Sequence, residues 1–306
     1  MKRHYNKQVQ IGTLLAIIAC VIWSGNFIAS RYSIQLAGPI SLAFYRWTIA
    51  TLTMLPFAYK NFKKEKHIFT QHFSYFFWMA LVGVAVYNTM IYQAGHSTTA
   101  INMALYGSII HPIVATLLAA WVVHEKLHWK SIAGIGLGIV GIIVLLSKGD
   151  INTLLHFRFA TGDLWMIGAG CCFGTYNVFV RKKPVGISNN SFLLVLFAIG
   201  TLLLCPFAMY EMAYVQPVQF SKELLIVVLY IGIGNSTIAY LLWNMAIHRL
   251  GAAKTALFGT LIPFLSSIEA LFILKEQFTI FQIISGVIII SGIVINTWPS
   301  KIKDGH

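Results

Sequence analysis

Polar side chains recur at helical spacing inside two long apolar segments. They form two sets of three residues spaced four apart: Asn88, Tyr92 and His96, and then Tyr240, Asn244 and His248. Residues at this spacing share one helix face, and polar groups on a membrane-spanning helix need partners or water, so we expect both faces to point into the protein. The amides and phenols predict a cavity wall that binds a small solute, with hydrogen bonding between helices as the alternative. For the two histidines, at the segment ends, we expect a packing role.

Further aromatic and amide side chains lie deep inside the apolar segments: Trp23, Asn26, Tyr87, Tyr106, Tyr176, Asn177 and Trp243. Tryptophan and tyrosine usually mark the membrane interface, so their positions at mid-depth need another explanation. Aromatic faces combined with a few amides predict a site for an amphipathic solute, such as an amino acid or a flat heterocycle. Plain packing between helices is the alternative.

Two charged residues lie within apolar segments. Arg46 and Glu269 align with leucines, Leu196 and Leu118, when the two halves of the chain are superposed. An intramembrane charge is costly unless it is paired or hydrated, which makes each residue a functional candidate. We expect both in the outer third of the membrane, where they can pair. Our hypothesis is that they take part in proton coupling or gating; a structural ion pair or a snorkelling carboxylate is the alternative.

One apolar segment occurs twice, as ALYGSIIHPIVATLLAAWVVHE at residues 104–125 and ALFGTLIPFLSSIEALFILKE at residues 256–276. The first copy is longer by one residue, His111, just before a proline. Such insertions are often absorbed as a π-bulge, which here would direct His111 into the cavity as a pH-sensitive group. The alternative is an imidazole bonded to a carbonyl that the proline frees. For Glu125 and Glu276, at the ends of the copies, we expect a structural role.

Composition defines the class of protein. Of the 306 residues, 58% are apolar and 10% charged, and the mean hydropathy is +0.74, which indicates an integral membrane protein. The net charge of +13 lies between the apolar segments, so we expect no nucleic-acid partner. We also expect no metal and no cofactor, because the four cysteines lie in apolar segments and no phosphate-binding loop is present. The GxGxxG run at 136–141 follows no strand, and its glycines predict close helix packing.

The apolar segments set the expected topology. Ten of them are long enough to cross a bilayer: 11–30, 39–58, 74–95, 99–123, 130–147, 163–180, 191–213, 224–247, 252–274 and 279–298. Alternate loops then hold 16 and 5 of the 22 lysines and arginines, with one inside a span. This asymmetry predicts that both termini, residues 1–10 and 299–306, are cytoplasmic.

The chain also repeats as a whole. Leu55-Pro56-Phe57-Ala58 matches Cys205-Pro206-Phe207-Ala208, and Arg31 matches Arg181, both at an offset of 150. We expect a first five-helix repeat at 11–147, a linker at 148–162 and a second repeat at 163–298. Because five is odd, the repeats have opposite orientations in the membrane, which is the architecture of alternating-access transporters.

Several motifs carry a family resemblance: W-S-G-N-F at 23–27, Arg46 after Gly38-Pro39, H-E-K at 124–126 and A-Y-L-L-W-N-M-A at 239–246. In order, spacing and topology the chain resembles the drug/metabolite transporter superfamily, in its ten-helix EamA-type branch. The resemblance implies a central cavity bounded by helices 1, 3, 4, 6, 8 and 9, with helices 5 and 10 outside. It also implies transport of small metabolites, often outward, and leaves the substrate open.

The sequence therefore predicts a secondary transporter that exports an amino acid or related amphipathic solute across a bacterial inner, cytoplasmic membrane by alternating access. The expected partners are that solute, the lipid bilayer and, as a candidate coupling ion, the proton; no obligate protein partner is expected. The alternatives are a broad-specificity proton-coupled pump for drugs and cations, and an intramembrane enzyme acting on lipid-linked substrates. The enzyme would need several converging titratable groups, and the sequence offers no nucleophile among them.

Overall fold

The computed structural model describes residues 2–26, 29, 35–98, 100–125, 128–147, 149–150, 152, 159–274 and 280–297. All regular secondary structure in these residues is helical, which confirms the predicted all-α class. The elements are α1 (Lys2–Ser24), α3 (Pro39–Gln71), α4 (Phe73–Ala80), η1 (Leu81–Val86), α5 (Tyr87–Gly95), α6 (Ala100–Val122), α7 (Trp129–Ser147), α9 (Thr161–Phe179), η2 (Val180–Lys182), α10 (Asn189–Tyr214), α11 (Lys222–Leu229), η3 (Tyr230–Ile238), α12 (Ala239–Leu250), α13 (Ala252–Phe258), α14 (Leu261–Leu274) and α15 (Ile280–Thr297).

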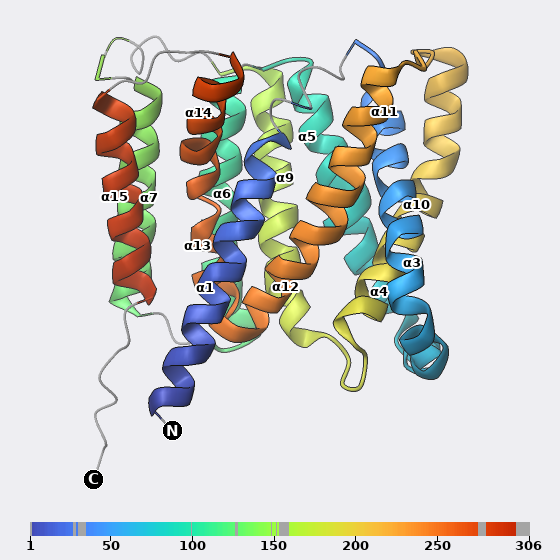
Figure 1. Ribbon diagram of the computed structural model, residues 1–306, viewed down its shortest axis with the longest axis horizontal. Helices are drawn as coiled ribbons and strands as arrows, with labels where there is room; N and C mark the ends of the chain where they lie inside the picture. Colours follow the sequence, from blue (N-terminus) through green and yellow to red (C-terminus); the bar gives the residue numbers. More distant parts are fainter. Residues whose placement is uncertain are drawn as a thin grey trace.

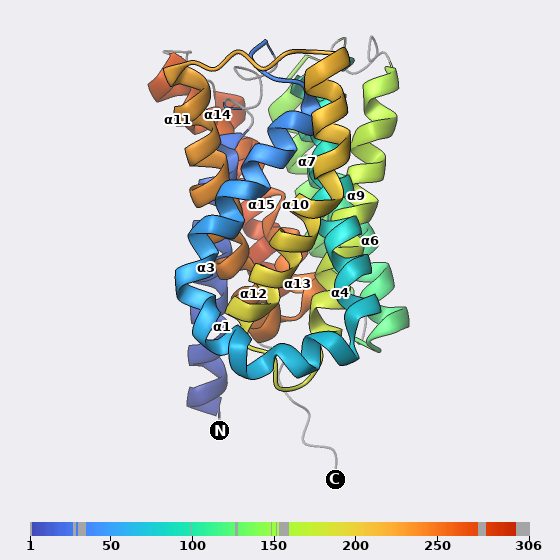
Figure 2. The ribbon, with the colours of Figure 1, turned by 90° about the vertical axis from the view of Figure 1, so that its right-hand side faces the viewer.

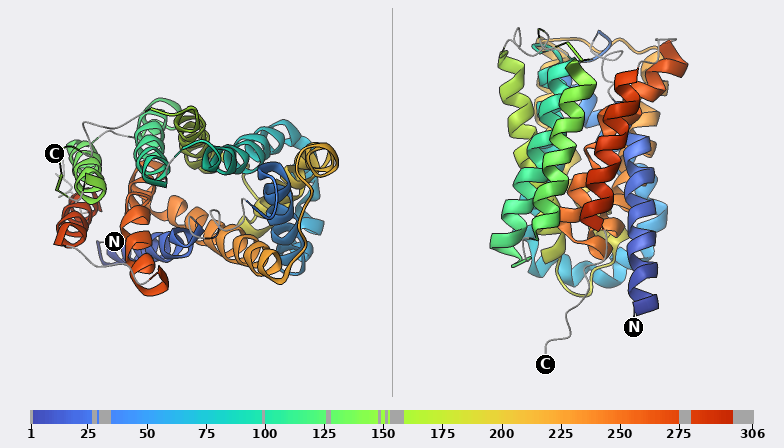
Figure 3. Two further views of the ribbon diagram at one scale, coloured as in Figure 1. Left: turned by 90° about the horizontal axis from the view of Figure 1, so that it is seen from above. Right: turned by 90° about the vertical axis from the view of Figure 1, so that its left-hand side faces the viewer.

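The helices stand side by side in one bundle (Figure 1). Helices α7 and α15 form a pair at one end, α3 and α10 lie at the other, and α1, α6, α9 and α12 occupy the middle, as the view from above shows (Figure 3). Helix α1 begins and α15 ends on the same side of the bundle, which we call the base (Figure 1).

Six stretches of the described residues are long and apolar enough to cross a membrane: Lys7–Ser24, Phe73–Gly95, Trp129–Ser147, Asn189–Tyr214, Lys222–Leu250 and Ile280–Thr297. A shorter apolar helix, Tyr106–Val122, accompanies them. The chain is therefore a multi-pass membrane protein, and the count of ten spans stays a prediction.

Glycines bring α7 and α15 into contact, as the sequence predicts. A Cβ atom on Gly134 would lie 2.8 Å from the carbonyl oxygen of Gly292, and one on Gly292 would lie 2.8 Å from that of Gly134. Beside them, Ser131 donates a hydrogen bond to Asn296 Oδ1 at 2.9 Å. Backbone contact without side chains between is the usual mode of close helix packing in membranes.

Helices α3 and α10 cap each other. Glu211 of α10 accepts hydrogen bonds from the backbone N–H groups of Ile40 and Ser41, at 3.2 and 2.7 Å, at the start of α3. At the base, Glu65 of α3 accepts hydrogen bonds from the backbone and hydroxyl of Ser188, the residue before α10, at 2.9 and 3.1 Å. Each carboxylate satisfies N–H groups that a helix start leaves without intrahelical partners.

Helix α3 is longer than the predicted span of 39–58, because it continues to Gln71. Its last turns run across the base of the bundle (Figure 2). Pro56 lies inside α3, where a proline removes a backbone hydrogen bond and permits a bend. The extension is amphipathic: Phe62, Ile68 and Phe69 pack against the core while its lysines are exposed.

The predicted π-bulge at His111 is wrong, because α6 is α-helical from Ala100 to Val122. The length difference is absorbed in the shorter copy, between α13 and α14. There the N–H groups of Gly259 and Thr260 donate to carbonyls three residues back, at 3.0 and 3.1 Å, in a tight turn. The π-helical turns lie elsewhere: η1 at Leu81–Val86 and η3 at Tyr230–Ile238, each between two α-helices.

Candidate functional site

A cavity lies in the middle of the bundle, between α1, α3, α5, α6, α9, α12 and α14. About 60 Å³ of it is open to the centres of water molecules, enough for a few waters. Seven of the predicted site residues line it: Trp23, Asn26, Arg46, Tyr87, Asn88, His111 and Tyr240. The two halves of the sequence both contribute to its wall.

Aromatic rings form one side of the cavity. Tyr87 stacks on Phe173 with ring centroids 4.7 Å apart, and Trp23 meets Phe173 edge to face at 5.5 Å. Tyr240 meets Trp23 edge to face at 5.6 Å. These rings offer apolar faces and positive ring edges to a planar or amphipathic solute. The sequence reasoning missed Phe173, whose apolar ring did not separate it from ordinary core residues.

One π-helical turn in each half of the chain precedes a polar residue of the cavity wall. Asn88 and Tyr240 each follow a π-helical turn, η1 and η3 respectively. The Tyr240 hydroxyl donates to the Gly83 carbonyl of η1 at 3.2 Å, and Asn88 Nδ2 lies 3.4 Å from the Val84 carbonyl. A π turn shifts the register of side chains that follow it, and such turns are frequent at functional sites.

Arg46 is 2% exposed and sits at the edge of the cavity. Its Nε donates to the Ser236 hydroxyl at 2.6 Å, and its Nη1 donates to the Tyr92 hydroxyl at 3.0 Å and to Asn26 Oδ1 at 3.5 Å. Tyr92 therefore supports the arginine and is absent from the described cavity wall.

Four of the predicted site residues form a buried hydrogen-bonded layer behind the aromatic rings. The Tyr176 hydroxyl donates to Asn244 Oδ1 at 2.9 Å, and Trp243 Nε1 donates to Asn177 Oδ1 at 2.7 Å. Trp243 also contacts Trp23, with centroids 4.9 Å apart. These residues are brought together next to the cavity, and they hold its wall without lining it among the described residues.

The remaining predicted site residues are scattered. Tyr106 packs against Phe159 at 6.3 Å between centroids and is outside the described lining of the cavity. Glu269 accepts a hydrogen bond from the Ser24 hydroxyl at 2.6 Å, while its Oε2 is buried with no hydrogen-bond partner among the described residues. Arg46 and Glu269, both described, form no ion pair, because each is bonded to neutral groups instead.

His111 meets neither predicted alternative as stated, because α6 has no bulge there and the carbonyl that Pro112 frees is that of Ser108. It lines the cavity, and its ring nitrogens lie 2.8 Å from the Gly107 carbonyl and 3.0 Å from the Ala256 carbonyl. A neutral imidazole carries one N–H and can donate to one of these two oxygens. The ring also packs against Gly259, at the turn between α13 and α14, where a Cβ would overlap it.

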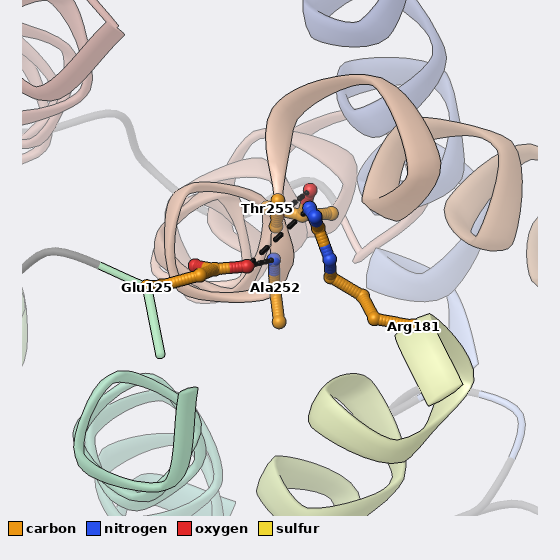
Figure 4. Close-up of polar contacts among 5 residues, drawn as sticks. Glu125, Arg181, Ala252 and Thr255 are labelled. Atoms are coloured by element: carbon orange, nitrogen blue, oxygen red, sulfur yellow. Dashed lines mark hydrogen bonds and ion pairs between the residues drawn. The ribbon is translucent and has the colours of Figure 1, made fainter. Parts of the chain in front are cut away.

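A second cavity, of about 240 Å³, lies near the base, and Glu125, Arg181 and Lys254 are among its lining residues. Glu125 Oε1 lies 3.3 Å from Arg181 Nη1 and accepts a hydrogen bond from the Ala252 backbone N–H at 3.1 Å (Figure 4). The carboxylate thus joins the end of α6 to η2 and to the start of α13. Glu276, its counterpart in the repeat, lies outside the described residues.

A helical membrane bundle around a small aromatic and polar cavity is an architecture that solute carriers use. The chain belongs to the EamA-like transporter family, which matches it over residues 10–147 and 160–298. An uncharacterized transporter of Archaeoglobus fulgidus is 29% identical over 289 residues, covering 93% of this chain and 96% of that protein.

A second relative and a solved structure show lower identity. A probable amino-acid metabolite efflux pump of Escherichia coli is 22% identical over 308 residues, covering 95% of this chain and 98% of that protein. The fold resembles one solved crystal structure with a TM-score of 0.71 at 18% identity, covering 93% of this chain and 95% of that one. The chain is thus a membrane transporter of the EamA type.

Proposed function

We propose that this protein exports an amino acid or a related amphipathic metabolite across the cytoplasmic membrane by alternating access. The observation that carries the proposal is the central cavity, where stacked aromatic rings and a few amide, phenol and guanidinium groups meet. Such a wall suits a solute with an apolar part and a polar part. The efflux-pump name of the Escherichia coli relative supports the same class of solute.

The proposed architecture is ten spans in two inverted five-helix repeats, with both termini cytoplasmic. The helix, π turn, helix order recurs at Phe73–Gly95 and Lys222–Leu250. Thr51 and Thr201, 150 residues apart, hydrogen-bond at 3.3 Å between α3 and α10. Contact between repeat-equivalent residues is what a twofold axis between these helices requires. The family also matches the chain in two stretches, residues 10–147 and 160–298. The start of α1 and the end of α15 lie on the same side of the bundle, the base (Figure 1).

In this mechanism the base of the bundle opens and closes. The cavity as it stands has room for only a few waters, so a solute needs the halves to separate around it. Glu125 belongs to the first proposed repeat, and its partners Arg181 and Ala252 belong to the second. This contact holds the base closed, and its release would admit a solute from the cytoplasm.

We further propose that Glu269 takes part in proton coupling. Its buried Oε2 lacks a hydrogen-bond partner among the described residues, so a proton there would relieve an uncompensated charge. A broad drug and cation pump would need Glu269 inside the aromatic cavity, and Glu269 is outside the described cavity wall. We therefore favour a metabolite carrier.

The experiment is counterflow of labelled amino acids and related metabolites in proteoliposomes, with and without a pH gradient. Saturable counterflow of one solute class is expected, and absence of flux for all of them would refute the proposal. Glu269→Gln is expected to remove the dependence on the gradient, whereas the exposed control Glu223→Gln retains it. Gradient dependence that survives in Glu269→Gln would refute the coupling role alone.

A further inference from the structure

The electrostatics of Arg46 point to one property of the transported solute. The guanidinium is buried, and its three hydrogen bonds go to the neutral groups of Ser236, Tyr92 and Asn26. Its carbon also lies 5.2 Å from the ring centroid of Trp47. An arginine stays protonated in proteins, so this positive charge persists inside the bundle.

None of the described acidic residues forms an ion pair with Arg46. Of the nine acidic residues in the chain, seven lie in the described ranges. Among these, Glu65 and Glu211 cap helices, Glu125 pairs with Arg181, and Glu269 bonds to Ser24. Asp150 accepts a hydrogen bond from Asn152, Asp163 accepts one from Thr98, and Glu223 is exposed. The ion pair of Glu125 with Arg181 is the only one between described residues.

The guanidinium of this cavity-lining residue also has a donor to spare. The three bonds use Nε and Nη1, which leaves Nη2 without a hydrogen bond to any described residue. A guanidinium presents its N–H groups as a planar fork that matches the two oxygens of a carboxylate. A buried positive charge with neutral partners and free donors is the arrangement expected of an anion receptor.

We propose that Arg46 binds the carboxylate of the transported solute, so that the cavity accepts amphipathic carboxylates and zwitterions and rejects uncharged amides and simple amines. This inference rests on the proposed export of an amino-acid-like metabolite. It specifies the group of the solute that the protein recognises. The rings of Trp23, Tyr87 and Phe173 face the apolar part of the same solute. Arg46 is then a specificity-determining residue of the cavity, a role different from the coupling or gating predicted from the sequence.

The test compares matched analogues in proteoliposomes. For the solute that shows counterflow, the free acid, its carboxamide and its decarboxylated amine compete for uptake. The wild type is expected to need at least about tenfold more amide or amine than acid for half-inhibition, which corresponds to 1.4 kcal/mol. Arg46→Gln is expected to reduce this ratio to about one, since a neutral amide binds acid and amide alike.

The control is Arg249→Gln, because the Arg249 guanidinium bonds only to the Met245 carbonyl of its own helix among the described residues, at 3.0 Å. It should keep the preference of the wild type for the acid. If Arg46→Gln transports none of the analogues, Arg46→Lys decides, because an ammonium keeps the positive charge and should retain part of the preference for the acid.

Three results would overturn the inference: equal competition by acid and amide in the wild type, a preserved ratio in Arg46→Gln, or a lost ratio in an active Arg46→Lys. Absence of flux for every solute in the wild type would instead refute the proposed function, and the inference with it. The two failures are therefore distinguishable.

Discussion

Removal of the Glu125 charge should shift the base of the bundle from the closed toward the open conformation. The ion pair with Arg181 is partly exposed, at 22% for Glu125 and 37% for Arg181, so it contributes about 0.2–1 kcal/mol. In Glu125→Gln the Ala252 N–H still has an acceptor, but this acceptor is neutral. The weaker hydrogen bond costs about 1 kcal/mol more. The sum, about 1–2 kcal/mol, favours the open base by a factor of about 5–30.

The assay is chemical modification of the cysteine in Thr116→Cys. Thr116 is 5% exposed and lines the second cavity, near the base, together with Glu125 and Arg181. In a background without the four native cysteines, a membrane-impermeant maleimide is applied from the side of the base. Glu125→Gln should raise the rate of modification about 5–30-fold. Arg181→Gln should raise it less, because the Ala252 contact remains. A rate in Glu125→Gln equal to that of the parent would refute the assignment of this contact as a closure.

Three further predictions concern packing. Glu211→Gln should destabilise the protein by about 2 kcal/mol, because a neutral amide replaces the acceptor of Ile40, Ser41 and the Ser41 hydroxyl; a thermal midpoint in detergent unchanged from the wild type would contradict this. Gly134→Ala should lower the thermal midpoint, since its Cβ would meet the Gly292 carbonyl, while Gly136→Ala should not, since no atom lies within 4 Å of its Cβ; equal effects of the two would refute the close contact of α7 and α15. Gly83→Ala should slow counterflow and raise the concentration for half-maximal flux, because its Cβ would overlap the Tyr176 ring behind the cavity; wild-type kinetics would show that this layer does not position the wall.

The sequence was sufficient for the parts of the site that follow from periodicity. Asn88 and Tyr240 lie in apolar segments with polar groups at helical spacing, and both line the cavity. The depth of Trp23 and Tyr87 in their segments pointed to the same place.

The other features of the site depend on tertiary contacts, which the spacing of residues in the sequence does not predict. The turn between α13 and α14 absorbs the one-residue difference because the second copy is shorter, whereas the sequence suggested a bulge at His111 in the longer one. The π turns before Asn88 and Tyr240 have no residue signature. The opposite charges of Arg46 and Glu269 suggested an ion pair between them. In the structure Arg46 instead bonds to the Ser236 hydroxyl, and Glu269 accepts from the Ser24 hydroxyl.

The most direct test of the account is access to the central cavity from the two faces of the membrane. Ser108 is 2% exposed and lines the cavity, so Ser108→Cys in a background without native cysteines reports on it. The account predicts that a membrane-impermeant thiol reagent modifies this cysteine from either face and that a transported solute protects it. Modification from one face only, or no protection by any transported solute, would contradict alternating access through this cavity.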